Sequence, residues 1–277
     1  MRAHSYLFVP ADRVDRFHKA LASGAHCVIV DLEDALAPGC KDTARDALAR
    51  WLQDAPDVPV HLRINGTDTP WFQDDIALCR SSGVRGIVLP KAESAAQVAE
   101  VVQLSHGKPL LPLIETAHGM AAVRDIAGTP GVQRLLFGSI DFQADLGIDG
   151  DDDALLAFRS ELVLASRLVG LAAPVDGVTT ALDDQDAITR DTARARRLGF
   201  GGKLCIHPKQ VAAVNVGFAP SDAEVDWARR VVQAIRASQG AAVAVDGKMV
   251  DAPVVKRAEA ILLSADPTGH ADPLSTP

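Results

Sequence analysis

Residues 110–116 read LLPLIET, an apolar run of strand length that ends in an acid and a threonine. Strands buried on both faces of a parallel sheet are near-continuous apolar runs, so this stretch predicts such a strand. Pro112 is unusual there, because proline has no N–H to donate to a sheet. We nevertheless expect a strand, with the carboxylate of Glu115 at its carboxyl end.

Similar apolar runs recur along the chain, separated by segments such as AAQVAEVVQL (95–104), whose apolar residues recur with the spacing of a helix. The expected strands are 5–10 (SYLFVP), 27–33 (CVIVDLE), 60–65 (VHLRIN), 86–91 (GIVLPK), 110–115 (LLPLIE), 134–139 (RLLFGS), 174–178 (PVDGV) and 202–207 (GKLCIH). Eight strands alternating with helices predict an α/β fold, the (β/α)8 or TIM barrel. A doubly wound open sheet is the alternative.

The chain is expected to contain one large domain and a small C-terminal extension. We assign residues 1–240 to the barrel. Residues 241–265 contain a strand or turn around DGKM and a closing helix, which together form a helical lid segment. Residues 266–277 mix Pro, Gly and Ser with few apolar side chains and are predicted to be a disordered tail.

Composition excludes several classes of protein. Apolar residues make up 48% of the 277 residues, charged residues 23%, and the net charge is -8, which is the wrong sign for coating a phosphate backbone. No apolar stretch is long enough for a membrane span. The four cysteines, Cys27, Cys40, Cys79 and Cys205, have no C-x-x-C pair, so we expect neither a disulfide framework nor a cysteine zinc site, and a cytoplasmic location.

Polar side chains follow nearly every expected strand. They are Asp31, Glu33 and Asp34; Arg63 and Asn65; Lys91; Glu115; Ser139 and Asp141; Asp176; and Lys203 and His207. In a barrel the carboxyl ends of all strands share one rim, where the active sites of such folds lie. Any one of these residues also suits a helix N-cap, but their joint occurrence predicts a site at the rim.

Glu115 and Asp141 follow adjacent strands, so their carboxylates can converge on one hard cation such as Mg²⁺. The structural alternative is an ion pair of Glu115 with Lys91 or Arg63, and an N-cap role for Asp141. Arg63 offers a planar fork of donors that matches a carboxylate; its alternative is an ion pair with Asp31 or Glu33.

Other catalytic motifs are missing from the sequence. It has no G-x-S-x-G elbow, Walker loop, dinucleotide fingerprint or H-E-x-x-H pair, so serine hydrolases, P-loop enzymes and zincins lose support. We interpret His118, His207 and Cys205 as structural residues.

Eight short motifs in this order resemble the citrate lyase beta-subunit-like proteins of the HpcH/HpaI aldolase superfamily. The motifs are SYLFVPADR (5–13), VIVDLEDA (28–35), LRIN (62–65), VLPKAE (88–93), PLIET (112–116), FGSIDFQADLG (137–147), GKLCIHPKQ (202–210) and DGKMVDAPVVKRAE (246–259). The similarity extends from Ser5 to about Leu263. His4 departs from the pattern, because many relatives have an arginine before the first strand.

The resemblance implies a (β/α)8 barrel with Mg²⁺ bound by Glu115 and Asp141, and with Arg63 clamping a substrate carboxylate. Asp251, in the motif KMVDAP, matches an aspartate on a C-terminal lid that often reaches a neighbouring subunit in stand-alone lyases for malyl-CoA or citramalyl-CoA. We therefore expect a homotrimer or a dimer of trimers. Asp251 is the expected proton donor to the departing enolate.

The implied reaction cleaves or forms a carbon–carbon bond in a 3-hydroxy-carboxyacyl-CoA, giving acetyl-CoA and pyruvate or glyoxylate. The backbone at Gly138 and Ser139 is expected to orient the oxo acid. Glu33 and Asp34 are expected to hold Lys91 or metal-bound water. The candidates for contacts to the phosphates of CoA are Arg13, Arg16, Lys19 and Lys209, which equally suit solvated surface charges.

Three alternatives stay open. The chain can be a citryl-ACP lyase subunit of a citrate lyase complex, or an aldolase that acts on free 2-oxo acids. It can also be a non-catalytic acyl-CoA-binding protein, although the presence of both expected metal ligands, the arginine and the lid aspartate argues against that.

Overall fold

The computed structural model describes residues 3–55, 57–238 and 243–265. The chain divides into two compact units, one formed by residues 3–216 and one beginning at Gly217. Each unit is described by itself. The disordered tail expected at residues 266–277 lies outside the described residues.

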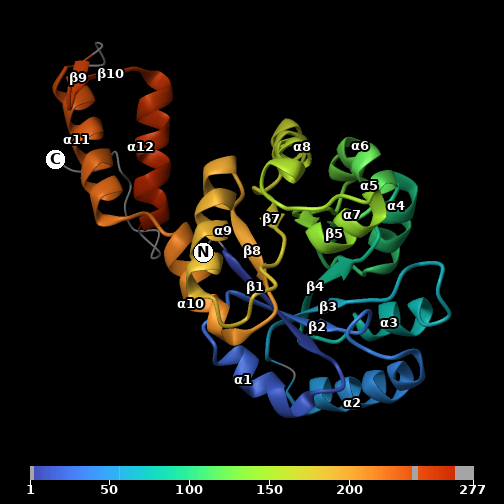
Figure 1. Ribbon diagram of the computed structural model, residues 1–277. Coiled ribbons are helices and arrows are strands. Elements are labelled where there is room, and N and C mark those ends of the chain that lie inside the picture. Colours follow the sequence, from blue (N-terminus) through green and yellow to red (C-terminus); the bar gives the residue numbers. More distant parts are fainter. Residues whose placement is uncertain (1–2, 56, 239–242, 266–277) are drawn as a thin grey trace. The chain divides into compact units, whose positions relative to one another are not determined.

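The first unit is a closed barrel of eight parallel strands in sequence order, ringed by helices (Figure 1). The strands are β1 (Ser5–Pro10), β2 (Cys27–Asp31), β3 (Val60–Arg63), β4 (Val84–Leu89), β5 (Leu110–Ile114), β6 (Leu136–Phe137), β7 (Val175–Asp176) and β8 (Gly202–Cys205). β1 pairs with β8, with Tyr6 opposite Leu204, and this closure excludes the open sheet. The predicted (β/α)8 barrel is confirmed, and Pro112 does not interrupt β5.

The helices of this unit follow the strands, with two short helices after β5 and two helices after β6. They are α1 (Phe17–Leu21), α2 (Lys41–Asp54), α3 (Phe72–Leu78), α4 (Ala95–Leu104), α5 (Ala117–Ala121), α6 (Val123–Ala127), α7 (Ser139–Leu146), α8 (Leu156–Leu168), α9 (Gln185–Leu198) and α10 (Pro208–Phe218). Short 3₁₀ turns lie at Val14–Arg16, Pro38–Cys40 and Asp153–Leu155.

Side-chain alternation along the strands explains why acids stand at the rim. Ile29 of β2 and Leu113 of β5 belong to the buried apolar cluster inside the barrel. Successive side chains of a strand point to opposite faces, so Asp31 and Glu115, two residues further on, share that inward side. The interior is therefore largely apolar, with His61 of β3 beside Cys27 as a polar member, and it is charged where the strands end.

The sequence analysis placed Asp176 and Lys203 at the rim, and this prediction is wrong for both residues. Both side chains are fully buried. Asp176 accepts a hydrogen bond from Nε of Arg159 in α8, at 2.9 Å from Oδ1, and Nζ of Lys203 donates to the carbonyl of Gly177 at 2.6 Å. Their neighbours Val175 and Leu204 fill the barrel interior, so these two charges point outward, toward the helix layer.

The second unit pairs two helices. α11 (Asp222–Ala237) and α12 (Ala252–Ala265) lie side by side, and an antiparallel hairpin of β9 (Val243–Val245) and β10 (Lys248–Val250) connects them (Figure 1). Its core contains Ala228, Val231, Val250 and Ala258. The sequence analysis placed α11 in the barrel domain, but its apolar face packs with α12, which puts it in the second unit.

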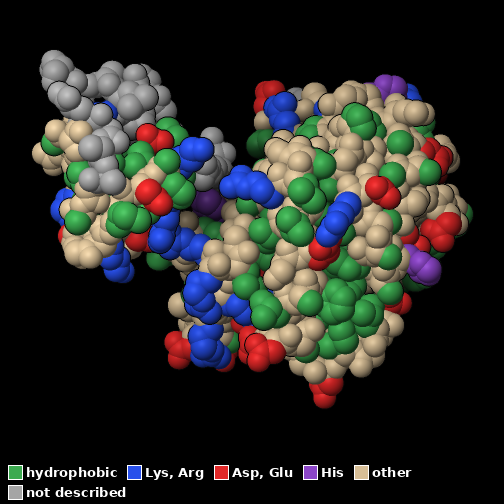
Figure 2. Space-filling view, turned by 90° about the horizontal axis from the view of Figure 1, so that it is seen from above, with side chains coloured by type: hydrophobic (Ala, Val, Ile, Leu, Met, Phe, Trp, Pro, Cys, Tyr) green, Lys and Arg blue, Asp and Glu red, His purple; other side chains and the backbone are tan. Residues whose placement is uncertain are grey.

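Two surface properties bear on the excluded classes. Within the described residues, no helix is long and apolar enough to cross a membrane. On the face shown in Figure 2, basic and acidic side chains both occur among small hydrophobic groups, rather than forming a continuous basic surface.

Candidate active site

Glu115 is the acid at the end of β5, and its side chain is almost completely buried. Oε1 accepts a hydrogen bond from the backbone N–H of Lys91 at 2.8 Å, whereas Oε2 is buried and has no hydrogen-bond partner. Burial raises the pKa of Glu115 to about 8, with the N–H of Lys91 and the charge of Arg63 opposing that rise. A buried carboxylate oxygen without a partner is a strong acceptor for a cation.

Gly138 lies next to this oxygen, and Asp141 is close enough for its charge to act on Glu115. A Cβ atom placed on Gly138 would come within 2.5 Å of Oε2 of Glu115, so only a glycine leaves room there. Gly138 precedes α7, and Asp141 is the third residue of that helix, exposed at the rim. The alternative role considered for Asp141, an N-cap, is not found, because no side-chain hydrogen bond caps this helix. The charge of Asp141 instead contributes to the raised pKa of Glu115.

These residues fit a hard divalent cation. The orphaned Oε2 atom and the space at Gly138 form a cradle, and the nearby carboxylate of Asp141 is of the oxygen type that Mg²⁺ prefers. Within the described part of the chain, no group of three or more His, Cys, Asp or Glu side chains is arranged to hold a metal. The protein thus provides two carboxylates, which suits Mg²⁺ because that ion keeps water or substrate oxygens as its other ligands.

Arg63 makes both of the ion pairs that the sequence analysis considered as its alternative role. Its Nε and Nη2 atoms donate to Asp31 at 2.7 and 2.6 Å, and Nη1 lies 3.2 Å from Oε2 of Glu33. The guanidinium also stacks over Phe8, 4.9 Å from the ring centroid. Asp31 and Arg63 are register partners in β2 and β3, which explains their contact. A guanidinium has five N–H donors, so others remain for a ligand.

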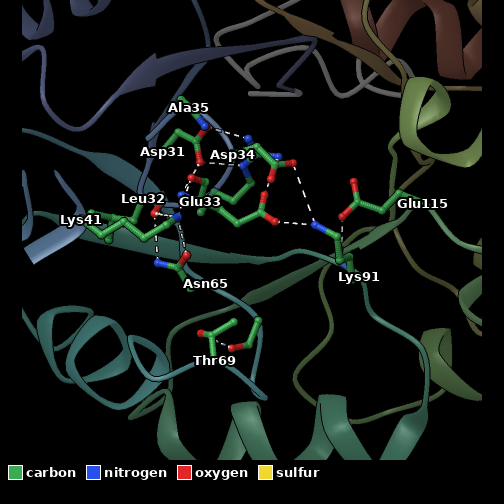
Figure 3. A network of polar contacts seen from close by, with 12 residues as sticks. Asp31, Leu32, Glu33, Asp34, Ala35, Lys41, Asn65, Thr69, Lys91 and Glu115 are labelled. Atoms are coloured by element: carbon green, nitrogen blue, oxygen red, sulfur yellow. Dashed lines mark hydrogen bonds and ion pairs between the residues drawn. The ribbon is translucent and has the colours of Figure 1, made fainter. Parts of the chain in front are cut away.

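Lys91 links Glu115 to a second acid (Figure 3). Its Nζ atom lies 2.5 Å from Oε1 of Glu33 and 3.9 Å from Asp34. Burial lowers the pKa of Lys91, but its hydrogen bond to Glu33 and the nearby carboxylates outweigh this and raise it. Burial raises the pKa of Glu33, and Arg63 and Lys91 oppose that rise. One of the two roles expected for Glu33 was to hold Lys91, and the structure shows that contact.

The sequence analysis missed a buried polar group under these acids. Nζ of Lys41, the first residue of α2, donates to the carbonyls of Leu32 and Glu33 and to the amide oxygen of Asn65, at 2.6–3.0 Å. Asn65 in turn donates to Asp75. This group fixes the loop after β2 that carries Glu33. A lysine at a helix start looks like an ordinary surface charge, so no sequence signal marks it.

Two cavities open near the rim. One, of about 800 Å³, is lined by Glu33, Lys91, Lys41 and Trp71 among others. The other, of about 430 Å³, lies between β1 and the end of β8 and is lined by Arg16, Lys19 and His207. Arg13 pairs with Asp15 and Lys209 with Asp183, both at the surface. Of the four residues expected to contact CoA, Arg16 and Lys19 line this second cavity. Arg13 and Lys209 are instead in surface ion pairs.

Asp251 lies in the second unit, directly before α12. Its side chain is exposed, and Oδ1 accepts a hydrogen bond from the backbone N–H of Val254 at 3.3 Å. This is the contact of a helix cap. Its expected catalytic role stays a prediction.

An eight-stranded parallel barrel with acids and an arginine at the carboxyl ends of its strands has the arrangement of the (β/α)8 enzymes, whose active sites lie at that rim. Within that class, the chain belongs to the HpcH/HpaI aldolase/citrate lyase family, whose profile matches residues 4–208. The prediction of an enzyme of this superfamily is confirmed.

Named relatives agree with this assignment. The citrate lyase subunit beta-like protein of Deinococcus radiodurans is 36% identical over 278 residues, covering 93% of this chain and 95% of that protein. A (3S)-malyl-CoA thioesterase of Cereibacter sphaeroides is 38% identical and covers 89% of each chain. The crystal structure of CitE from Mycobacterium tuberculosis with magnesium, acetoacetate and coenzyme A has a TM-score of 0.84 and 35% identity, covering 95% of this chain and 98% of that one.

The space at Gly138 gives a first prediction. In Gly138→Ala the new methyl group would collide with Oε2 of Glu115, so we expect Mg²⁺ affinity, measured by titration calorimetry, to fall at least about tenfold. Gly39→Ala is the matched control, because a Cβ atom there meets open space, and it should bind Mg²⁺ like the unaltered protein. Unchanged affinity in Gly138→Ala would place the metal elsewhere.

The pKa of Glu115 gives a second prediction. In the metal-free protein this group is protonated below pH about 8, so its contribution to stability is complete at acidic pH and is lost as the pH rises toward 8. A cation needs the carboxylate, so Mg²⁺ binding should release about one proton at pH 7 and none at pH 9, and affinity should weaken as the pH falls below 8. Calorimetry in buffers of different ionisation heat measures the released proton. Release that is unchanged in Glu115→Gln would contradict this account.

Proposed function

We propose that the protein is a Mg²⁺-dependent carbon–carbon lyase for a 3-hydroxy-carboxyacyl-CoA such as citramalyl-CoA or malyl-CoA. The observation that carries the proposal is the buried Glu115 carboxylate, which has one oxygen without a hydrogen-bond partner and lies within the electrostatic influence of Asp141 and Arg63. The resemblance to CitE solved with magnesium, acetoacetate and coenzyme A supports a metal, a small oxo acid and CoA as ligands.

Glu115 and Asp141 are the residues that would hold the cation. When bound, Mg²⁺ supplies a Lewis acid that polarises the oxygen of the incipient carbonyl. Arg63 binds the carboxylate of the oxo-acid half, because Asp31 and Glu33 hold its guanidinium in one orientation. The amide of Gly138 already donates to the carbonyl of Ile114, so the backbone contact to the oxo acid falls to Ser139.

The bond between the hydroxyl-bearing carbon and the carbon next to the thioester breaks. The hydroxyl gives its proton to the carboxylate of Asp251 and becomes the carbonyl of pyruvate or glyoxylate, and the electron pair of the broken bond passes to the acetyl-CoA enolate. A proton must then reach the enolate carbon. We assign that proton to Asp251, whose place on the α11–α12 unit suits a lid supplied by the same or a neighbouring subunit of a homotrimer.

CoA is proposed to enter through the cavity between β1 and β8. Arg16 and Lys19 line it and offer cations to the phosphates. Arg13 and Lys209 are available only if their surface ion pairs open, and such exposed pairs contribute little because solvent screens them.

A second candidate is hydrolysis of the thioester of malyl-CoA, because a relative with 38% identity is a (3S)-malyl-CoA thioesterase. The two reactions give different products. A lyase releases glyoxylate and acetyl-CoA, whereas a thioesterase releases malate and free CoA. The citryl-ACP lyase, the aldolase on free 2-oxo acids and the non-catalytic binder remain as further alternatives.

The test is product analysis with purified protein, citramalyl-CoA and malyl-CoA, with and without EDTA. The proposal expects oxo acid and acetyl-CoA in a metal-dependent reaction. Free CoA without oxo acid would select the thioesterase. Turnover only in the presence of an acyl-carrier partner would select the citryl-ACP lyase subunit. Turnover of pyruvate with a simple aldehyde would select the aldolase. Binding of CoA esters without any turnover would indicate a binding protein.

Asp251→Asn provides a third prediction. We expect CoA-ester binding to persist and turnover to fall at least about 100-fold, because the general acid is lost. Asp246→Asn in the same unit is the control, and this variant should keep the activity of the unaltered protein. Asp246 lies in the turn of the hairpin and pairs with Arg230 of α11. Wild-type turnover in Asp251→Asn would remove this residue from the mechanism.

A further inference from the structure

We propose that Lys91 is the positioning residue of the Glu115 carboxylate. The ion pair between its ammonium and Glu33 stabilises the left-handed turn at residue 91, and that turn keeps the Lys91 amide on Oε1 of Glu115 and leaves Oε2 for a divalent cation. The inference rests on the proposed metal site. It concerns how the cation is held, not which thioester is cleaved.

The backbone of Lys91 is unusual. Its φ angle is 46°, in a region that L side chains rarely adopt because Cβ approaches the following carbonyl oxygen. Such a conformation persists only where surrounding contacts hold it. β4 ends at Leu89, so residue 91 lies where the chain leaves the barrel. A turn at this point lets one residue direct its amide to one acid and its side chain to another.

The amide determines which oxygen of Glu115 is available. Its N–H donates to Oε1 at 2.8 Å, and Oε2 is the buried atom that faces the space at Gly138 without a partner. The carboxylate therefore offers a single oxygen in a fixed direction. A carboxylate that is free to rotate would lose this preorganisation, and with it affinity for the cation.

The ammonium group of Lys91 forms the ion pair that offsets the strain of its left-handed backbone. Nζ lies 2.5 Å from Oε1 of Glu33 (Figure 3). Nη1 of Arg63 lies 3.2 Å from the other oxygen of Glu33. Glu33 is nine-tenths buried, whereas the Lys91 side chain is about half exposed. The anchored partner is thus the glutamate, and the ion pair restrains the lysine.

A purely electrostatic role for Lys91 makes the opposite prediction. An ammonium near a cation site repels the cation, so its removal would strengthen Mg²⁺ binding, whatever residue replaced it. A positioning role depends instead on whether the new residue tolerates the left-handed turn.

Two variants separate these roles. Lys91→Met keeps the strained backbone and loses the ion pair, so its Mg²⁺ affinity, measured by calorimetry on metal-free protein, should fall about tenfold. Lys91→Gly also loses the ion pair but adopts positive φ freely, so it should bind Mg²⁺ within about threefold of the unaltered protein. His106→Gly is the matched control: His106 has a φ of 52° in the loop before β5, and this variant should leave Mg²⁺ affinity unchanged.

Equal Mg²⁺ affinities in Lys91→Met and Lys91→Gly would overturn the proposal. A second measurement applies if Lys91→Met does not fold, which its thermal unfolding without metal would show. Glu33→Gln should weaken Mg²⁺ binding more in the Lys91 background than in the Lys91→Gly background, and equal losses would overturn the proposal. If the predicted order holds but no thioester is cleaved, the proposed function fails and the positioning role stands.

Discussion

The rim depends on the burial of Glu115. A carboxyl group that has left water must regain hydrogen bonds, a counter-charge or a proton, because an isolated buried charge is very unfavourable. The fold gives this group one backbone N–H and leaves the other oxygen without a partner. The metal-free site therefore retains a proton, with a pKa of about 8, and a divalent cation can take the place of that proton.

The charged side chains around Glu115 contact one another in a series. These contacts fix the orientation of each side chain as well as balancing its charge. Asp31 and Glu33 hold the guanidinium of Arg63 from two sides, and Lys91 then holds Glu33. Each link is buried or half-buried, so screening by solvent is weak. The left-handed turn at Lys91 costs about 1–2 kcal/mol and persists only where surrounding contacts hold it. The site thus joins Glu115, the proposed metal ligand, to Arg63, the proposed substrate clamp, through contacts of defined geometry.

The sequence predicted the parts of the structure that depend on local pattern. Eight apolar runs located the eight strands, and alternation along β5 explains why Glu115 points inward. Asp176 and Lys203 were misplaced because β7 and β8 are short, with only two residues in β7, so that polar and apolar residues do not reveal which face is interior. Lys41 was missed because its burial follows from the β2–α2 loop folding over it. The pairing of Asp31 with Arg63 depends on strand register, which a linear sequence does not display.

The account stands on Glu115 and Asp141 sharing one divalent ion. The most direct measurement is a crystal structure of the protein with Mn²⁺ in place of Mg²⁺, in which the anomalous signal locates the ion independently of any assumed ligand. The account predicts one strong peak about 2 Å from a single oxygen of Glu115 and about 2 Å from an oxygen of Asp141. A peak bound to other residues, or Glu115 and Asp141 oxygens too far apart to share one ion, would contradict it.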